Sequence, residues 1–194
     1  MTGVLLAGGK SARLGQHKYL LPFDGRPLGW HLLCRLRQVT GHQLIVANDP
    51  SPFAGWAAPV IPDQFPGRGP LAGIHAGLAA APDDLILAVA CDLPFFSAPL
   101  GAHLGSLAAG GEYDVVIPRR GQFLEPLCAV YAKSALPVIS RQLCSGDGRV
   151  SAALDGLRVR YVEQPERASF GPDEILFLNI NSPADLARAR ALWS

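Results

Sequence analysis

The sequence has almost no net charge and few charged residues of either sign. The formal net charge is +1 at pH 7, and Asp, Glu, Lys and Arg together make up 17% of the chain. Proteins that bind nucleic acid or an anionic membrane through their overall charge need a clear excess of Lys and Arg. We therefore expect no nucleic-acid partner and no membrane partner, and any anionic ligand must be held by a local site.

Cysteine motifs and long apolar runs are also missing. None of the four cysteines has CxxC spacing, which favours buried free thiols in a reducing compartment over a metal or redox role. The five histidines show no metal-ligand spacing. No apolar run reaches the length of a membrane span, and the N-terminus MTGVLLAGGK lacks the basic region of an export signal. We expect a cytoplasmic protein.

What the sequence does contain is a regular alternation of short apolar runs and longer helical patterns. This alternation is typical of βαβ units. It predicts an α/β fold, a Rossmann-like three-layer sandwich in which a mostly parallel sheet has helices on both faces, formed by one domain over residues 1–194. The segment 164–173 is expected to be a surface loop. Strands are expected at 4–7, 44–47, 59–61, 85–90, 114–117, 127–131, 159–162 and 176–178, and helices at 27–38, 71–80, 99–109, 135–143, 150–154 and 183–192.

The first expected strand runs directly into a glycine-rich loop. The loop reads Ala7-Gly8-Gly9-Lys10-Ser11-Ala12-Arg13-Leu14-Gly15, and Lys18 follows. Consecutive glycines let backbone N–H groups approach anionic oxygens, and Arg13 and Lys18 would add two cations. A Walker A loop is excluded because its first glycine would fall at Val4, and there is no GxGxxG motif. The loop predicts a phosphate site, and a strand-to-helix turn that merely needs glycine is the alternative.

A single aspartate follows the continuous apolar strand expected at 85–90. Asp92 lies in the segment Cys91-Asp92-Leu93-Pro94, and the carboxyl ends of parallel strands are where open α/β sheets bind ligands. Mg²⁺ is commonly held by one or two carboxylates together with phosphate oxygens. Asp92 is therefore a candidate Mg²⁺ ligand, and capping of the turn before Pro94 is its alternative role.

The run from Leu5 to Gly15, with Lys18 and Leu20-Leu21-Pro22 after it, resembles the signature of the MobA-like nucleotidyltransferases. The resemblance continues in order along the chain, through Asp63, Gly69-Pro70-Leu71, Asp92, Pro126 and the segment from Asn179 to Leu186. It implies a fold of the nucleotide-diphospho-sugar transferase type. Leu6-Ala7-Gly8-Gly9 is similar to the guanylyl branch, which transfers GMP from GTP to the terminal phosphate of molybdopterin and releases pyrophosphate. Cytidylyl-transferring relatives tend to have Ala in place of the first Gly.

The resemblance also implies roles for individual residues. Arg13, Lys18 and Asp92 would be catalytic, with Asp92 as the Mg²⁺ ligand. Asp63 would bind GTP, or it is a solvated loop acid, and Asn48 would meet the guanine edge, or it only forms a turn. The segment around Gly69 would lie beside the nucleotide, or its small residues only serve helix packing. The full set of expected nucleotide contacts is Leu6, Ala7, Gly8, Gly9, Lys18, Asn48, Asp63, Gly69, Pro70, Leu71 and Asp92.

Four further residues are expected to face the acceptor molecule. They are Glu125, Arg149, Asn179 and Asn181. Arg149 is equally compatible with a surface position, and one of the two asparagines could reach the metal instead of the acceptor phosphate. Two positions depart from the family pattern: His17 stands where relatives commonly have Asp, and Val46 stands where they often have Asn.

Two alternative functions remain open at this stage. One is a related transferase that uses CTP or a sugar phosphate, and the other is a nucleotide-binding protein without turnover. Transient contact with proteins of molybdenum cofactor biosynthesis or with acceptor proteins is expected, as is a monomer or weak oligomer.

Overall fold

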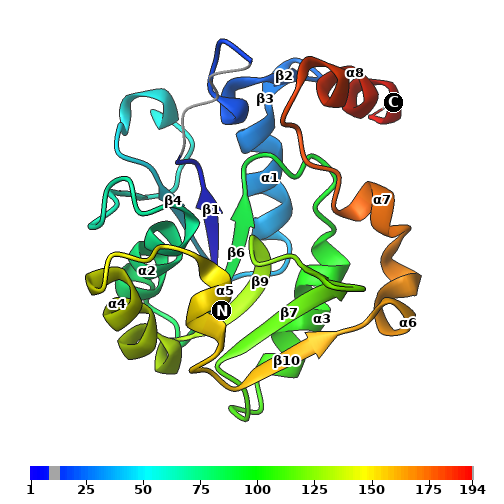
Figure 1. Ribbon diagram of the computed structural model, residues 1–194. Coiled ribbons are helices and arrows are strands. Elements are labelled where there is room, and N and C mark those ends of the chain that lie inside the picture. The colour runs from blue at the N-terminus through cyan, green and yellow to red at the C-terminus, as the bar shows by residue number, and fades with distance from the viewer. Residues whose placement is uncertain (9–13, 194) are drawn as a thin grey trace.

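The computed structural model describes residues 1–8 and 14–193 and consists of a central sheet between two layers of helices (Figure 1). The strands of this sheet are β1 (Thr2–Leu6), β4 (His42–Val46), β5 (Val60–Ile61), β6 (Leu85–Ala90), β7 (Val115–Arg120), β8 (Phe123–Leu124), β9 (Cys128–Ala132) and β10 (Val159–Val162). The helices are α1 (Leu28–Arg37), α2 (Pro70–Ala80), α3 (Ala98–Ala108), α4 (Leu136–Cys144), α5 (Val150–Leu154), α6 (Gln164–Arg167), α7 (Asp173–Leu176) and α8 (Pro183–Leu192).

The described strands of the main sheet follow the order β10-β7-β9-β6-β1-β4-β5, and β8 pairs with β7. Strand β1 is parallel to both of its neighbours, β4 and β6. Strand β9 is antiparallel to β6 and β7. The expected Rossmann-like three-layer fold with a mostly parallel sheet is confirmed, with β9 as an antiparallel insertion.

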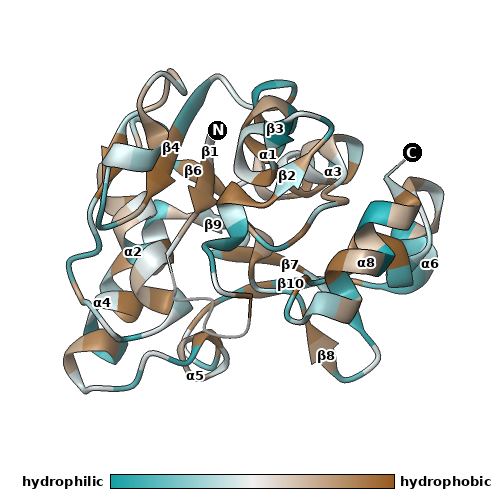
Figure 2. Cartoon of the chain, turned by 90° about the horizontal axis from the view of Figure 1, so that it is seen from above, coloured by the Kyte–Doolittle hydropathy of each residue, from teal (hydrophilic) through white to brown (hydrophobic). Residues whose placement is uncertain are grey.

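The central strands have apolar side chains on both faces because helices cover both faces. Val4 and Leu6 of β1 pack with the helices α2, α4 and α5, whereas Leu5 points the other way and packs with α1 and α3. Figure 2 shows the result from above, with β1, β4 and β6 in the brown of apolar residues. Because successive side chains of a strand point to opposite faces of the sheet, one strand contributes to two separate cores.

After β1 the chain adds strands first on one side of β1 within the sheet and then on the other. It first builds β4 and β5 on one side, and then β6 on the other side of β1. In open α/β sheets such a reversal leaves a crevice beyond the carboxyl ends of the strands. The arrowheads of β1 and β6 point toward the upper half of Figure 1, and the candidate site is found beyond them.

The expected strand at 176–178 is wrong, and so is the expected loop at 164–173. Residue 176 ends the short helix α7, and residues 177–178 are buried without strand pairing. Pro172 and the acidic residues Asp173 and Glu174 favour a helix start, which outweighs an apolar run too short to define a period. Within 164–173 the chain forms α6 and a 3₁₀ turn at Ala168–Phe170. The two-residue pairing of β2 (Pro22–Phe23) with β3 (Arg26–Pro27) was not expected either.

The cysteines and the helix lengths can be compared with the expectations. All four cysteines are free, and Cys91 and Cys128 are buried as expected, whereas Cys144 at the end of α4 is exposed. Among the described residues, no helix is both long enough and apolar enough to cross a membrane.

Asp83 holds the amino ends of the central strands together. These ends lie opposite the carboxyl ends, where the candidate site is found. Asp83 Oδ2 accepts a hydrogen bond from Thr2 Oγ1 at 2.7 Å and lies 3.0 Å from His42 Nδ1. These contacts, that of His42 first, lower the pKa of Asp83 from 3.8 to about 2. The contribution of Asp83 to stability is therefore present above about pH 4 and lost as the pH falls toward 2.

We expect Asp83→Asn to lower the free energy of unfolding at pH 6 and to have little effect near pH 2. Urea unfolding of both proteins between pH 6 and pH 2.5 measures the difference, with Asp84→Asn at the adjacent exposed carboxylate as the control. A difference between the wild type and Asp83→Asn that stays constant over this range contradicts the assignment.

Candidate active site

A cavity of about 490 Å³ lies beyond the carboxyl ends of β1, β4 and β6. Each of the three strands contributes residues at or just after its last position, as expected for a ligand crevice at the reversal of strand order. The lining residues are Leu6, Gly8, Lys18, Val46, Ala47, Asn48, Asp63, Gly67, Gly69, Pro70, Gly73, Ala90, Cys91, Asp92 and Leu127.

Lys18 and Asp92 meet at this cavity although 74 residues separate them. Lys18 Nζ donates to Asp92 Oδ2 at 2.8 Å and to Asn181 Oδ1 at 2.6 Å. The side chains of Lys18 and Asp92 are 19% and 18% exposed, so the pair is partly shielded from water but open to a ligand. A bond from Ile180 N to Asp92 O at 3.0 Å brings the segment before α8 against the end of β6. Three distant parts of the chain therefore converge on one ammonium group.

The position of Lys18 follows from the residue next to it. Tyr19 is buried at 4% exposure in the core beneath the 3₁₀ turn η1 (Lys18–Leu20). Its ring lies 4.7 Å from that of Phe53 and stacks on His17 at 5.0 Å. Because the Tyr19 ring fixes the turn from below, the neighbouring Lys18 side chain is directed into the cavity. His17 packs on this ring, where an Asp would offer a carboxylate instead.

Asn48 and Asp63 belong to one hydrogen-bonded loop at the far side of the cavity. Asn48 Oδ1 accepts from Asp63 N at 3.0 Å, and Asp63 Oδ1 accepts from Phe65 N at 2.7 Å. The Asn48 amide nitrogen has no hydrogen-bond partner among the described residues. Asn48 can therefore offer a donor, and Asp63 a carboxylate oxygen, to a base or a ribose.

The segment Gly67–Pro70 forms the wall where helix α2 begins. Gly69 has φ +72° and ψ −163°, a backbone conformation that side chains rarely allow. Pro70 follows as the first residue of α2, whose N-terminus carries the partial positive charge of the helix. A helix start of this kind, bordering the cavity, suits an anionic ligand.

A second cavity of about 700 Å³ adjoins the first and shares Gly67, Gly69 and Pro70 with it. Two guanidinium groups, Arg68 and Arg149, and the exposed aromatic ring of Phe123 border it. Arg149 is 76% exposed and pairs with Asp147 at 2.6 Å. The full lining is Gly67, Arg68, Gly69, Pro70, Gln122, Phe123, Leu124, Pro126, Gly146, Gly148, Arg149, Val150, Ser151 and Leu154.

Two loops meet backbone to backbone at the second cavity, which makes glycine necessary at residue 148. A Cβ atom added to Gly148 would lie 1.6 Å from Arg68 O. Arg68 Nη1 also donates to Gly146 O at 2.7 Å. We expect Gly148→Ala to push the loops apart and to lower the free energy of unfolding by about 1–3 kcal/mol.

Urea unfolding measures this loss, and Gly41→Ala is the matched control because nothing lies within 4 Å of a Cβ at that position. Equal stability of Gly148→Ala and the control would show that the loops do not meet as described.

Several predicted site residues lie away from the cavity surfaces. Ala7 and Leu71 are buried in the two cores, at 4% and 0% exposure. Asn179 donates to Phe177 O at 3.1 Å, and Asn181 contacts Lys18. Glu125 is buried and pairs with Arg120, and burial raises the pKa of Glu125 while the Arg120 hydrogen bond opposes the rise. Gly9 and Arg13 lie outside the described residues.

The thiol nearest to the cavity is not suited to nucleophilic chemistry. Burial, together with the charge of Asp92, raises the pKa of Cys91 to about 12. The thiolate is the reactive form of cysteine, and it is nearly absent at neutral pH when the pKa is this high. At this end of the cavity the side chains that can act on a phosphate are therefore Lys18 and Asp92 rather than Cys91.

A family model described as a MobA-like NTP transferase domain matches residues 3–167. The chain belongs to this family. The MobA-like chain is 38% identical over 194 residues to a molybdenum cofactor guanylyltransferase of Desulfosudis oleivorans, covering 98% of this chain and 95% of the relative.

Solved structures agree with the family. The MobA-like chain matches molybdopterin-guanine dinucleotide biosynthesis protein A from Archaeoglobus fulgidus with a TM-score of 0.86 and 29% identity, covering 99% and 98% of the two chains. A 2-C-methyl-D-erythritol 4-phosphate cytidylyltransferase from Thermus thermophilus matches with a TM-score of 0.68 at 20% identity, covering 97% and 96%, and shares the fold. The expected type of fold is confirmed, and the MobA-like chain is a nucleotidyltransferase.

Nucleotidyltransferases typically use a divalent metal, and Asp92 fits such an ion. Asp92 Oδ1 is buried and has no hydrogen-bond partner among the described residues. The described residues contain no group of three or more His, Cys, Asp or Glu side chains that could hold a metal. A metal at this MobA-like site would therefore take Asp92 as its protein ligand and complete its coordination with phosphate oxygens and water.

Arg68 and Phe123 border the second cavity but were not among the predicted site residues. Arg68 lies between two glycines in Pro66-Gly67-Arg68-Gly69-Pro70, and this composition is a usable signal for a tight loop that exposes its central side chain. Phe123 gives no such signal, because a single aromatic residue in a short strand is usually part of a core. In this structure the Phe123 side chain is nevertheless 63% exposed.

Proposed function

We propose that this chain transfers GMP from GTP to the terminal phosphate of a molybdopterin-type cofactor and releases pyrophosphate. The observation that carries the proposal is the meeting of Lys18 and Asp92 in a cavity that shares a wall with a second, cation-bordered cavity. Two adjoining cavities suit a reaction between two bulky substrates. The names of the relatives at 36–38% identity support guanylyl transfer to the molybdenum cofactor.

The chemistry requires one anion to attack another. An oxygen of the acceptor phosphate forms a bond to the α-phosphorus of GTP, and the bond from this phosphorus to the bridging oxygen of pyrophosphate breaks. A phosphate monoester is already largely ionised at pH 7, so the acceptor needs no general base. Positive charge and positioning are what the protein can supply.

We assign that charge to Lys18 and, outside the described residues, to Arg13. The Lys18 ammonium stabilises the developing charge on the transferring phosphate, and charge-assisted hydrogen bonds of this kind contribute about 1.5–3 kcal/mol each. Asp92 holds Mg²⁺, which when bound neutralises phosphate oxygens and acts as a Lewis acid. Asn181, which accepts from Lys18 Nζ at 2.6 Å, keeps the ammonium oriented.

The nucleotide is proposed to occupy the smaller cavity. Leu6 and Gly8 line it at the end of β1, and Asn48 and Asp63 line it at the other side with their polar groups. The acceptor is proposed to occupy the larger cavity, where Arg68 and Arg149 can hold its phosphate by forked hydrogen bonds. Phe123 offers an apolar ring to its planar pterin. Residues 1–194 would then work as one domain, because both cavities share lining residues.

The test is a product analysis with both substrates. The protein is incubated with GTP, Mg²⁺ and molybdenum-loaded molybdopterin, and the expected product is heavier than the acceptor by one GMP, with one pyrophosphate released. A preference for CTP over GTP in the same assay removes the guanylyl assignment. Tight GTP binding without product leaves a binding protein, and a catalytic role is then wrong.

A further inference from the structure

Arg167 is a fully buried guanidinium far along the chain from the motifs of the active site. Its exposure is 0%, and it is among the largest fully buried side chains of the described residues. Removing a charge from water is costly unless hydrogen bonds and an opposite charge compensate it. A buried arginine at the end of a four-residue helix therefore needs a reason.

The contacts of Arg167 join two short helices to the edge of the sheet. Its Nε and Nη2 donate to the two carboxylate oxygens of Asp173 at 2.9 and 2.6 Å, and its Nη1 donates to Val162 O at 2.8 Å. The first bond pair links α6 to the start of α7, and the third links both to the end of β10. Two parallel hydrogen bonds of this kind fix the orientation of the guanidinium relative to the carboxylate as well as the distance between them.

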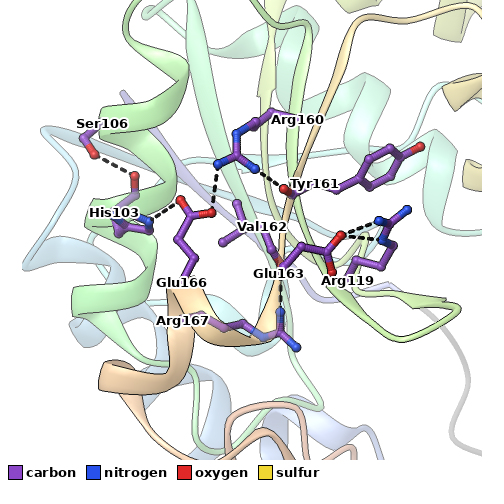
Figure 3. A network of polar contacts seen from close by, with 9 residues as sticks. All are labelled: His103, Ser106, Arg119, Arg160, Tyr161, Val162, Glu163, Glu166 and Arg167. Atoms are coloured by element: carbon purple, nitrogen blue, oxygen red, sulfur yellow. Dashed lines mark hydrogen bonds and ion pairs between the residues drawn. The ribbon is translucent and has the colours of Figure 1, made fainter.

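The helix that carries Arg167 is itself tied down by a polar network. Figure 3 shows Glu166 between His103 of α3 and Arg160 of β10, and Glu163 beside Arg119 of β7. Arg167 extends from the same helix toward Val162 O. Because this network anchors α6, Arg167 is a fixed point from which Asp173 and α7 are positioned.

From α7 the chain reaches the active site within a few residues. The Arg167 guanidinium carbon lies 5.7 Å from the centre of the Phe177 ring, which is also contacted by Arg120 at 5.4 Å. Phe177 N donates to Asp173 O at 3.1 Å, so the ring is held by the same helix turn. Ile180 N then bonds to Asp92 O, and Asn181 Oδ1 accepts from Lys18 Nζ.

We propose that Arg167 and Asp173 are a positioning pair that sets the place of Asn181 and, through Asn181, the orientation of Lys18. The inference rests on the proposed function of Lys18, and it adds a residue pair that does not line either cavity. Buried packing of Leu176, Phe177 and Leu178 holds the segment in the core, but apolar contacts are non-directional. The forked ion pair adds a directional constraint from the α6 side, beside the hydrogen bonds from Ile180 N to Asp92 O and from Asn181 N to Asp185 Oδ2.

The test is a double-mutant cycle on kcat, in which the Arg167–Asp173 pair is one member and Asn181 is the other. Arg167→Met with Asp173→Leu removes both charges together, so that no unpaired charge is left in the interior. We expect kcat to fall about tenfold, as for a misplaced catalytic group, with KM for GTP changed less than about twofold. Asn181→Ala is expected to cause a similar fall. The three substitutions together should then lower kcat no further than Asn181→Ala alone, since the pair acts through Asn181.

The control is the ion pair at the other end of β10, whose arginine side chain is 59% exposed. Arg158 Nε and Nη2 donate to Asp114 at 3.0 and 2.8 Å, also as a fork, but at the amino end of the strand. Arg158→Met with Asp114→Asn is expected to lower the melting temperature and to leave kcat within about twofold of the wild-type value. A control that lowers kcat as strongly as the Arg167–Asp173 variant, or fully additive effects with Asn181→Ala, would overturn the proposal. If the neutral double variant does not fold, Arg167→Lys replaces it, because lysine keeps the charge and loses the fork.

A second measurement does not depend on the reaction. The chain has three lysines, Lys10, Lys18 and Lys133, so incorporation of ¹³Cε-labelled lysine gives few side-chain resonances without altering the ammonium groups, and Lys18→Arg identifies that of Lys18. We expect the Lys18 resonance to shift in the Arg167–Asp173 variant in the same direction as in Asn181→Ala, and to stay in place in the control. An unchanged Lys18 resonance overturns the positioning role. This result holds even if product analysis shows that guanylyl transfer is the wrong reaction.

Discussion

Replacing Asp92 by asparagine is expected to lower turnover by about 10²–10³-fold or more, the loss typical of a missing preorganised charge. Asparagine has nearly the same shape, and its carbonyl oxygen can still accept the bond from Lys18 Nζ, so the geometry of the site is retained. What is lost is the negative charge that can hold a divalent ion at the buried Oδ1. The measurement is pyrophosphate release at saturating GTP and acceptor.

The metal dependence of this variant distinguishes a ligand from a structural carboxylate. If Asp92 holds Mg²⁺, the wild type should saturate at a lower Mg²⁺ concentration than Asp92→Asn. Asp114→Asn is the control, because Asp114 is also a poorly exposed carboxylate, at 11%, but pairs with Arg158 away from the cavities. Near-normal pyrophosphate release from Asp92→Asn would remove Asp92 from the mechanism.

The central strands could be predicted from the sequence because strands buried on both faces are continuous apolar runs. The run at 85–90 is apolar at every position, and β6 occupies Leu85–Ala90. The segment 176–178 is equally apolar, but it lies at 4–7% exposure without a partner strand. Burial can be deduced from such a run, whereas the hydrogen-bond partner depends on which edge of the sheet is free. That information is not local.

The site shows the same division between local and distant information. Sequence reasoning assigned Lys18 and Asp92 to one ligand, and their side chains are in contact in the structure. It placed Glu125 beside the acceptor; in the structure this side chain is buried and paired with Arg120, next to Leu124 and Pro126 of the second cavity lining. The direction of a side chain beside the two-residue strand β8 depends on the register between β7 and β8. No periodicity in so short a strand can reveal it.

The contacts that unite the site are those between segments very distant in the chain. Lys18 and Asn181 are 163 residues apart, and Arg68 and Gly146 are 78 apart. The first contact depends on the segment before α8 passing the end of β6, and the second on two loops packing without side chains. Neither follows from propensity or composition, because both result from how the sheet and its crossovers are assembled.

Replacing Lys18 by alanine is expected to lower turnover by about 10²–10³-fold or more, comparable to the loss from Asp92→Asn. Among the described residues, Lys18 is the Lys or Arg side chain that lines the smaller cavity. Its removal leaves the negative charge on the transferring phosphate without this positive partner. Asp92 and Asn181 also lose their shared donor, so GTP affinity should fall as well. Lys133→Ala, in the 3₁₀ turn at Lys133–Ala135, is the control for removing a lysine elsewhere.

Lys18→Arg separates charge from geometry. Arginine keeps the positive charge, but its planar fork cannot take the place of a compact ammonium between Asp92 Oδ2 and Asn181 Oδ1, which are 2.8 and 2.6 Å from Lys18 Nζ. We expect GTP binding, measured by calorimetry, to be largely retained while pyrophosphate release stays low. If Lys18→Arg restores full turnover, charge alone is sufficient and the orientation provided by Asn181 is unnecessary. If Lys18→Ala itself releases pyrophosphate at a near-normal rate, the transferring phosphate does not lie beside Lys18.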